Sequence, residues 1–331
     1  MSNSYRGRRR RGLPPIVPIA LLALAGAAVF FLGQMGNRGP AGEPAASPPA
    51  DKPAQSQQGQ QSAAPLPEHA STASGIGCTL TELGEEAMYT GNLILVNNQI
   101  LYHFPQEQEL VNIYEEKTSG YYVRDMEVYL SPVAMEALNR LLDAFLENGG
   151  SKTINVVAGY RDAAFQQHLF DQSTERNGLD HAEKYVAQPG GSEHHTGLAV
   201  DLSVLRNGVS QDYDGTGEYA WINENCQDYG WVVRYESGKE ELTGIWDEPW
   251  HFRYVGAPHA AEMARQGLCL EEYTEYLRQF PFDGEHLFIQ CADGAYEVWY
   301  TQGTEVYLPD GGEYEVSGNN ADGVIVTCKV A

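Results

Sequence analysis

The stretch SEHHTGLAVDLS, residues 192–203, places an aspartate inside a run typical of a buried β-strand, seven residues after a histidine. From residue 197 onward the side chains alternate between the two faces of the predicted strand. Asp201 falls on the face opposite Leu198, Val200 and Leu202. A carboxylate on the inner face of a sheet is costly unless a positive group lies beside it. The sequence therefore predicts a cationic partner for Asp201.

A second segment, EPWHFRYV at residues 248–255, carries the same types of metal ligand. His251 alternates with aromatic residues, so it projects from a strand face as Asp201 does. If the two strands are neighbours, His194, Asp201 and His251 can converge on one cation. Two imidazoles and one carboxylate, with a fourth position left open, form the ligand set of a catalytic zinc site. A zinc ion would then be the positive partner of Asp201.

His195 complicates this prediction, because two adjacent side chains on an extended chain point apart and only one of them can be a ligand. Spacing alone does not choose between His194 and His195, and a histidine near a glycine is often only a hydrogen-bonded structural residue. Glu248 precedes Pro249, which cannot continue a strand ladder. Its carboxylate can therefore lie beside the cation and take a proton from water, whose pKa a bound metal lowers to about 7.

The N-terminal part predicts a membrane protein. Residues 1–12 hold five arginines and no acid, and the apolar run at 13–33 has roughly the 20 residues that a bilayer span requires. Basic residues flank the cytoplasmic side of a span, so we expect residues 1–12 to be a cytoplasmic arm and everything downstream to be exported. A cleaved signal peptide is the alternative, because Ala25-Gly26-Ala27 fits a cleavage site. Residues 34–75, rich in Pro, Ala, Gln, Ser and Gly, predict a disordered linker.

Charge and cysteine content exclude some functions. The formal net charge is −24, and the part after residue 12 carries −29, because five of the 21 basic residues and none of the 45 acidic ones lie before it. Such acidity argues against nucleic acid as a partner. The five cysteines form no CxxC pair, which argues against a thiolate zinc site. Cys291 and Cys328, near the two ends of the last segment, could form a disulfide.

Helical spacing and turn signals predict mixed helices and strands in the exported part. One helix begins at Ser131-Pro132 and ends at Gly149-Gly150, and Asp162 caps the next. Further predicted helices cover 181–186 and 270–280, and predicted strands cover 153–158, 231–235 and 250–255. Two strand-like runs flank Asn97-Asn98 within 92–104, and short β-like runs fill 281–331.

Three motifs in this order resemble a known family. SEHHTGLAVD fits the pattern S-x-H-x-x-G-x-A-x-D, EPWHFRY fits E-x-W-H-x-x-Y, and GYRDAAFQ lies upstream of both. Together they resemble the VanY-type zinc D-alanyl-D-alanine carboxypeptidases, relatives of the D,D-dipeptidases of vancomycin resistance. The resemblance covers roughly residues 93–276 and is strongest over 159–256.

The resemblance implies a role for each matching residue. His194 rather than His195 matches the zinc ligand, since Ser192 precedes it by two residues and Gly197 follows by three. Asp201 and His251 match the other ligands of Zn²⁺, and Glu248 matches the catalytic base. Substrate-contacting positions of the family match Arg161, which is expected to stabilise the scissile carbonyl or hold substrate, Gln166 and Ser192. The serine that usually follows the arginine is replaced by Asp162.

We therefore predict an α+β fold with an antiparallel-sheet zinc peptidase core and flanking helices at 76–280. Outside the part that the resemblance covers, the sequence predicts an N-terminal transmembrane helix and a small β-rich C-terminal domain at 281–331. The implied function is removal of the terminal D-alanine from peptidoglycan stem peptides outside the membrane. An L,D-carboxypeptidase, a D,D-dipeptidase, a cross-link endopeptidase and a non-catalytic wall-binding module are the alternatives. We expect a single-pass cell-membrane protein, or a secreted one if the N-terminal segment is cleaved; the sequence does not determine its oligomeric state.

Overall fold

The computed structural model describes residues 66–330. The predicted cytoplasmic arm (1–12), the predicted span (13–33) and the linker up to residue 65 lie outside the described residues. Among the helices within 66–330, none has the length and apolar character needed to cross a bilayer. The last part of the predicted linker contains strand β1 (His69–Ser71), which pairs with β2 (Gly77–Glu82), so the structured part begins before the predicted residue 76.

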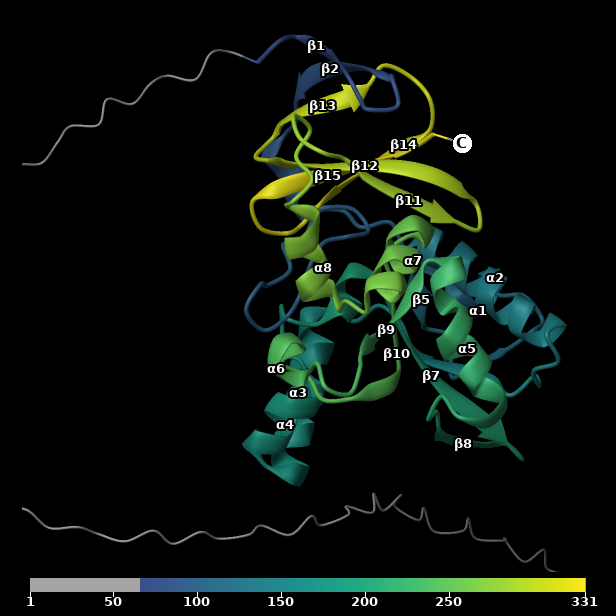
Figure 1. Ribbon diagram of the computed structural model, residues 1–331. Helices are drawn as coiled ribbons and strands as arrows, with labels where there is room; N and C mark the ends of the chain where they lie inside the picture. Colours follow the sequence, from purple (N-terminus) through teal and green to yellow (C-terminus); the bar gives the residue numbers. More distant parts are fainter. Residues whose placement is uncertain (1–65, 331) are drawn as a thin grey trace, which may run out of the picture. The chain divides into compact units, whose positions relative to one another are not determined.

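A six-stranded sheet forms the centre of the fold and carries the motifs described above (Figure 1). All its pairings are antiparallel except the one between β4 and β6. The strand order is β4-β6-β7-β10-β9, and β8 pairs with the far end of β7. The strands are β4 (Tyr122–Val123), β6 (Ile154–Ala158), β7 (Ala199–Arg206), β8 (Val209–Asp212), β9 (Trp231–Tyr235) and β10 (Glu248–Tyr254). The predicted strands at 153–158, 198–203, 231–235 and 250–255 are therefore confirmed.

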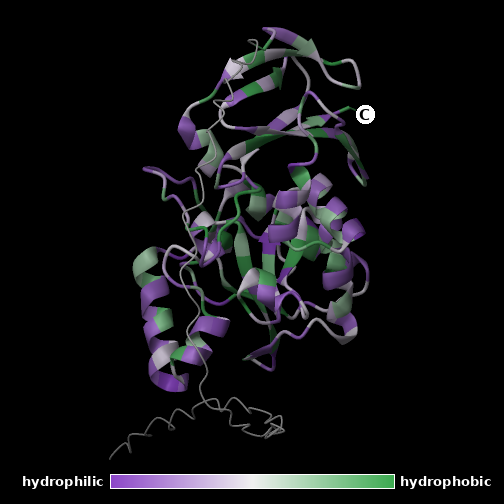
Figure 2. Ribbon diagram, turned by 60° about the vertical axis from the view of Figure 1, so that its left-hand side comes forward, coloured by the Kyte–Doolittle hydropathy of each residue, from purple (hydrophilic) through white to green (hydrophobic). Residues whose placement is uncertain are grey.

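Helices cover this sheet and its edges. Helix α2 (Pro132–Glu147) packs Leu138, Leu142 and Phe145 into a core that also contains Val200 and Leu202 of β7. Green apolar residues accordingly concentrate along the sheet in Figure 2. The other helices are α1 (Ile113–Glu116), α3 (Ala163–Asn177), α4 (Leu179–Tyr185), α5 (Ala220–Asn225), α6 (Glu240–Thr243), α7 (Ala257–Gln266) and α8 (Leu270–Leu277).

The predicted helix starts are confirmed, with one difference in chemistry. Asp162 caps α3, because its Oδ1 accepts a hydrogen bond from the backbone N–H of Phe165 at 2.7 Å. Ser131 stands at the cap position of α2, but its side chain makes no capping bond there. Pro132 at the first helical position supplies the fixed φ angle that starts the helix.

The C-terminal strands form a separate antiparallel sheet of order β11-β12-β15-β14. Strand β13 does not join this sheet but pairs with β2, so residues that precede the six-stranded sheet in the sequence contribute to the C-terminal β region. The short strands β3 (Val111–Asn112) and β5 (Tyr129–Leu130) pair with each other in a two-stranded antiparallel sheet. The C-terminal strands are β11 (Leu287–Cys291), β12 (Gly294–Gln302), β13 (Glu305–Pro309), β14 (Tyr314–Gly318) and β15 (Gly323–Lys329).

The two strands predicted within residues 92–104 are not present, although the turn between them is. Residues 93–96 are buried yet belong to no strand. Their backbone groups bond to other partners: Arg253 donates to the carbonyl of Ile94, and Asn320 donates to the carbonyl of Leu95. Asn97 forms the turn through its side-chain Oδ1, which accepts from two following backbone N–H groups.

The predicted disulfide between Cys291 and Cys328 is wrong, and all five cysteines, which lie within residues 66–330, are free thiols. Cys291 on β11 pairs in register with Gly294 of β12, and Cys328 on β15 pairs with Glu297 of β12. The two cysteines thus lie on the strands either side of β12, roughly 9–10 Å apart across the sheet and three residues, roughly 10 Å, apart along it. A disulfide requires Cα atoms within about 7 Å.

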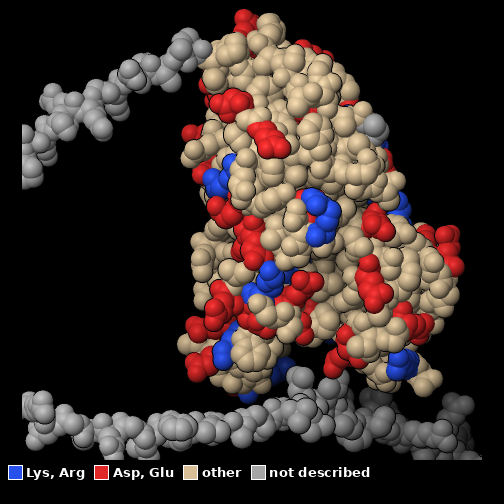
Figure 3. All heavy atoms as spheres, viewed as in Figure 1, with Lys and Arg blue, Asp and Glu red and all other residues tan. Residues whose placement is uncertain are grey.

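Acidic side chains predominate over basic ones on the face shown in Figure 3, as the formal charge of −24 leads one to expect.

Candidate active site

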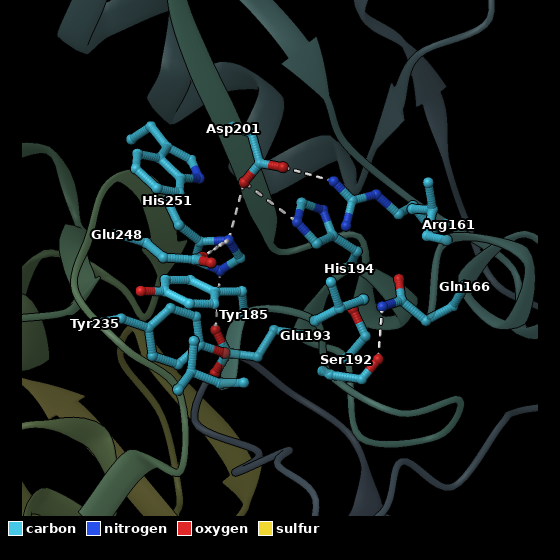
Figure 4. Close-up of a pocket in the computed structure, with 15 residues that line it drawn as sticks. Arg161, Gln166, Tyr185, Ser192, Glu193, His194, Asp201, Tyr235, Glu248 and His251 are labelled. Carbon is cyan, nitrogen blue, oxygen red and sulfur yellow. Dashed lines mark hydrogen bonds and ion pairs between the residues drawn. The ribbon is translucent and has the colours of Figure 1, made fainter. Parts of the chain in front are cut away.

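Three candidate ligands predicted from the sequence lie together in the structure (Figure 4). His194 belongs to a short 3-10 helix, residues 193–196, just before β7, while Asp201 and His251 lie directly opposite each other on β7 and β10. One nitrogen or oxygen atom from each side chain lies within 4.8 Å of the others. The strand neighbours assumed in the sequence analysis are thus real neighbours.

The donor atoms fit a zinc ion. Asp201 Oδ1 lies 3.3 Å from His194 Nε2 and 2.9 Å from His251 Nδ1. Two tetrahedral ligands about 2 Å from a zinc ion are separated by roughly 3.3 Å, close to these spacings. His194 Nδ1 lies 2.6 Å from the carbonyl oxygen of Gly159, which fixes the proton on Nδ1 and leaves the Nε2 lone pair free.

Burial keeps His194 suited to metal binding. Removal from solvent, together with the nearby Arg161 guanidinium, lowers the pKa of His194 to about 4, so the imidazole is neutral at physiological pH. Only the neutral ring has a lone pair for a metal. Burial alone would raise the pKa of the neighbouring Asp201, but the two imidazoles and the Arg161 guanidinium hold it well below its usual range, so this carboxylate is ionised.

Glu248 lies beside the ligands without joining them. Its Oε2 is 4.0 Å from His251 Nδ1, and its side chain is largely buried in the same pocket. Burial raises the pKa of Glu248 to about 8, and the negative charge of Asp201 contributes in the same direction. A cation among the ligands would lower this pKa, since an opposite charge within a few ångströms favours the carboxylate.

Arg161 is a positive partner of Asp201 that the sequence analysis did not pair with it. Its Nη2 lies 2.5 Å from Asp201 Oδ2, and its backbone N–H donates to the carbonyl of His194. His195 points away from the metal ligands: its Nδ1 lies 2.7 Å from the Arg161 carbonyl oxygen, and its Nε2 accepts from the N–H of Gly190. The structure therefore separates the two adjacent histidines, with His194 in the ligand cluster and His195 supporting the backbone of Arg161.

Gln166 and Ser192 line a cavity of about 270 Å³ next to these groups. The Gln166 amide donates to the carbonyl of Ala187 at 2.8 Å, while its Oε1 is buried without a partner among the described residues. The wall is completed by aromatic and aliphatic residues that the sequence analysis did not single out, among them Tyr185, Tyr235, Ile245 and Trp250.

The sequence analysis also missed the buried carboxylate of Glu193, which lies behind His251. Glu193 is 1% exposed, and its Oε1 accepts from Arg234 at 2.7 Å and from Arg253 at 2.9 Å. Burial alone would raise the pKa of Glu193, but the two guanidinium groups hold it well below its usual range. The sequence did contain a signal for a buried carboxylate here. Arg253 stands two residues after His251 on the same face of a predicted buried strand, and a buried arginine needs an acidic partner.

Comparison with known proteins shows the family of this chain. The family model described as VanY, D-alanyl-D-alanine carboxypeptidase, matches residues 127–257. A D-alanyl-D-alanine carboxypeptidase of Enterococcus faecium is 34% identical over 253 residues, which cover 73% of this chain and 77% of the relative. This chain belongs to the VanY family.

Two further relatives extend the likeness. The bifunctional D-Ala-D-Ala dipeptidase and D-Ala-D-Ala carboxypeptidase VanXYC of Enterococcus gallinarum is 38% identical over 47% of this chain and 82% of its own. The crystal structure of the vancomycin-resistance D,D-dipeptidase VanXYg, in complex with a D-Ala-D-Ala phosphinate analogue, has a TM-score of 0.68 and 32% identity. The match covers 76% of this chain and 99% of the VanXYg chain. The chain is therefore a peptidase with a mixed α/β core. Its cluster of three candidate ligands could hold a metal ion.

Proposed function

We propose that this protein is a zinc-dependent D-alanyl-D-alanine carboxypeptidase that removes the terminal D-alanine from peptidoglycan stem peptides. The observation that carries the proposal is the meeting of His194 Nε2, Asp201 Oδ1 and His251 Nδ1 in one pocket. Glu248 stands 4.0 Å from the last of these atoms. The carboxypeptidase relative of Enterococcus faecium supports the choice of substrate.

In this mechanism His194, Asp201 and His251 would hold Zn²⁺, which when bound would supply Lewis-acid polarisation and lower the pKa of water. Glu248 then accepts the proton of the attacking water through its carboxylate and delivers it to the leaving amine of D-alanine. Its burial, which excludes bulk water, suits a group that shuttles one proton within the site.

Arg161 is the proposed electrostatic partner of the substrate. Its guanidinium lines the cavity while one nitrogen remains bonded to Asp201, so its orientation is fixed before substrate arrives. A cation held in this way stabilises the charge that develops on the carbonyl oxygen. Gln166 can accept a peptide N–H at its unpartnered Oε1, and Ser192 contributes to the pocket wall.

The decisive experiment incubates the full-length protein with muropeptides that carry pentapeptide stems, with and without a chelator, and determines product masses. Loss of one alanine from the pentapeptide, abolished by the chelator and restored by zinc, supports the proposal. Action on tetrapeptide stems alone would indicate an L,D-carboxypeptidase, and cleaved cross-links would indicate an endopeptidase. Binding without any cleavage would leave only a wall-binding function.

A second activity, hydrolysis of the free dipeptide D-Ala-D-Ala, is the other candidate. It is favoured by the likeness to VanXYg, a D,D-dipeptidase whose chain is matched over 99% of its length. The same incubation with free D-Ala-D-Ala distinguishes a bifunctional enzyme from one restricted to stem peptides.

We further propose that residues 13–33 anchor the protein in the cell membrane, with the peptidase part outside. The support is the apolar run after an arginine-rich segment. Fractionation of cells, followed by protease treatment of intact protoplasts, should leave the protein in the membrane fraction with its peptidase part cleaved. Recovery from the culture medium without its N-terminus would indicate a cleaved signal peptide.

A further inference from the structure

A cluster of fully buried charges lies directly behind His251. Arg234 and Arg253 project from neighbouring strands β9 and β10, and both donate to Oε1 of Glu193. Arg234 also donates twice to Glu271 of α8, at 2.9 and 2.7 Å. Arg253 has its remaining donors on backbone carbonyls, among them that of Ile94 at 2.8 Å. The carboxylate of Glu193 is therefore fixed in place by two arginines.

The other oxygen of this carboxylate faces the metal site. Glu193 Oε2 is buried and makes no hydrogen bond to any described residue, and His251 Nε2 is likewise buried without one. These two atoms lie 3.5 Å apart. Figure 4 shows Glu193 on the side of the His251 ring away from Asp201. Two unpartnered polar atoms that face each other in a buried site point to a shared proton.

We propose that Glu193 is a positioning residue for the metal ligand His251, which it holds in the tautomer with the proton on Nε2. This inference rests on the metal site of the proposed function. A ring that presents the Nδ1 lone pair to a metal carries its proton on Nε2, and that N–H needs an acceptor when it is buried. Glu193 Oε2 is the acceptor that the described structure offers. Carboxylates placed in this way orient ligating histidines and increase their basicity.

The alternative role for Glu193 is to neutralise the two buried arginines and nothing more. The substitution Glu193→Gln separates these roles. The amide oxygen can still accept from both arginines, but the amide NH₂ then faces His251 Nε2 as a donor and favours the tautomer with the proton on Nδ1. That tautomer cannot bind a metal through Nδ1. A purely neutralising role predicts lower stability with unchanged zinc affinity.

Zinc affinity of the full-length protein, measured by competition with a chromogenic chelator, tests the proposal. We expect Glu193→Gln to bind zinc about 10–100-fold more weakly than the unaltered protein. Glu271→Gln is the matched control, because it removes a carboxylate from Arg234 but lies away from His251. Its zinc affinity should stay within a factor of two. Equal zinc affinities of the two variants would overturn the proposal.

A second measurement needs no substitution at residue 193, so a folding defect in that variant does not prevent the test. Nitrogen-15 NMR of the zinc-loaded protein with labelled histidine should show His251 bound through Nδ1 with a proton on Nε2, its signals assigned by through-space contacts between its ring and the neighbouring ring of Tyr235. A zinc-bound Nε2 would contradict the positioning role alone. Failure of the unaltered protein to bind zinc would contradict the proposed function instead.

Discussion

His251 and Asp201 are directly opposite each other across the antiparallel pair β7–β10, with His251 Nδ1 2.9 Å from Asp201 Oδ1. Side chains alternate faces along a strand, so a slip of one residue in this pairing would turn one of the two away from the site. The register of the central sheet therefore holds two of the three ligands together, and the core formed by α2 against β7 holds the register.

Removal of either strand ligand should abolish metal binding. We expect His251→Ala and Asp201→Ala to lose bound zinc and all hydrolysis of pentapeptide stems, because each leaves only two ligands for the ion. Zinc content by atomic absorption, measured beside activity, checks this. His195→Asn is the matched control, since His195 points away from the cluster and its replacement should retain the metal. Normal zinc content in the His251 variant would refute the ligand assignment.

Glu248 should behave differently from the ligands. Glu248→Gln keeps the shape of the side chain but cannot accept a proton, so kcat should fall by about 10²–10⁴-fold while zinc is retained. Zinc content and steady-state kinetics on a pentapeptide muropeptide measure the two effects separately. A variant with unchanged kcat would assign the base to another residue, and one without zinc would make Glu248 a ligand.

The position of Glu248 shows where reasoning from the sequence stops. Residues separated by three positions on a regular strand point to opposite faces, so Glu248 and His251 should not share a site. Against β9, Glu248 pairs with Tyr235 while Phe252 pairs with Val233, so β10 has two extra residues between them. This bulge, which contains Pro249, turns both side chains into one pocket. The sequence provided the proline but not the bulge.

Local patterns predicted more than long-range contacts. The helix starts and the four central strands follow from alternation and capping residues. Alternation also indicated Asp201 and His251 as ligands, whereas the choice of His194 over His195 came from the family resemblance. The buried segment 93–96 was mistaken for a strand, because its apolar residues are equally suited to an irregular segment whose carbonyls bind Arg253 and Asn320. The contact of Glu193 with Arg234 joins residues 41 positions apart, and no local pattern indicates it.

His259 should make the protein less stable in acid. It is buried between Tyr273 and Thr327, with both ring nitrogens 2.8 Å from a hydroxyl oxygen. Burial lowers its pKa from 6.5 to about 3, so between these values the unfolded chain takes up a proton that the folded protein does not. The free energy of unfolding therefore falls as the pH drops below 6.5, by about 2 kcal/mol at pH 5 from this group.

Urea unfolding of the unaltered protein and of His259→Gln, at pH 7.5 and pH 5, isolates this contribution. The glutamine does not titrate, so the stability difference between the two proteins should shrink by about 2 kcal/mol on acidification. A constant difference at the two pH values would show that His259 does not titrate as described.

Asn320 should be one of the few positions where glycine is better tolerated than alanine. Its φ angle is +63°, a left-handed conformation that alanine adopts only with strain, and it is buried in the turn between β14 and β15. Its amide donates to the carbonyls of Leu95 and Leu101. These hydrogen bonds connect the irregular segment that contains residues 93–96 to the C-terminal strands. Both substitutions leave these carbonyls without their donor, but only Asn320→Ala adds backbone strain.

We therefore expect Asn320→Gly to lower the free energy of unfolding by about 1–3 kcal/mol and Asn320→Ala by about 1 kcal/mol more. Urea unfolding at neutral pH measures both. Hydrogen exchange should also accelerate in residues 93–96 of each variant, because that segment has lost the hydrogen bond from the Asn320 amide and forms no strand pairs of its own. An alanine variant as stable as the glycine variant would show that the backbone at Asn320 is not in the left-handed conformation.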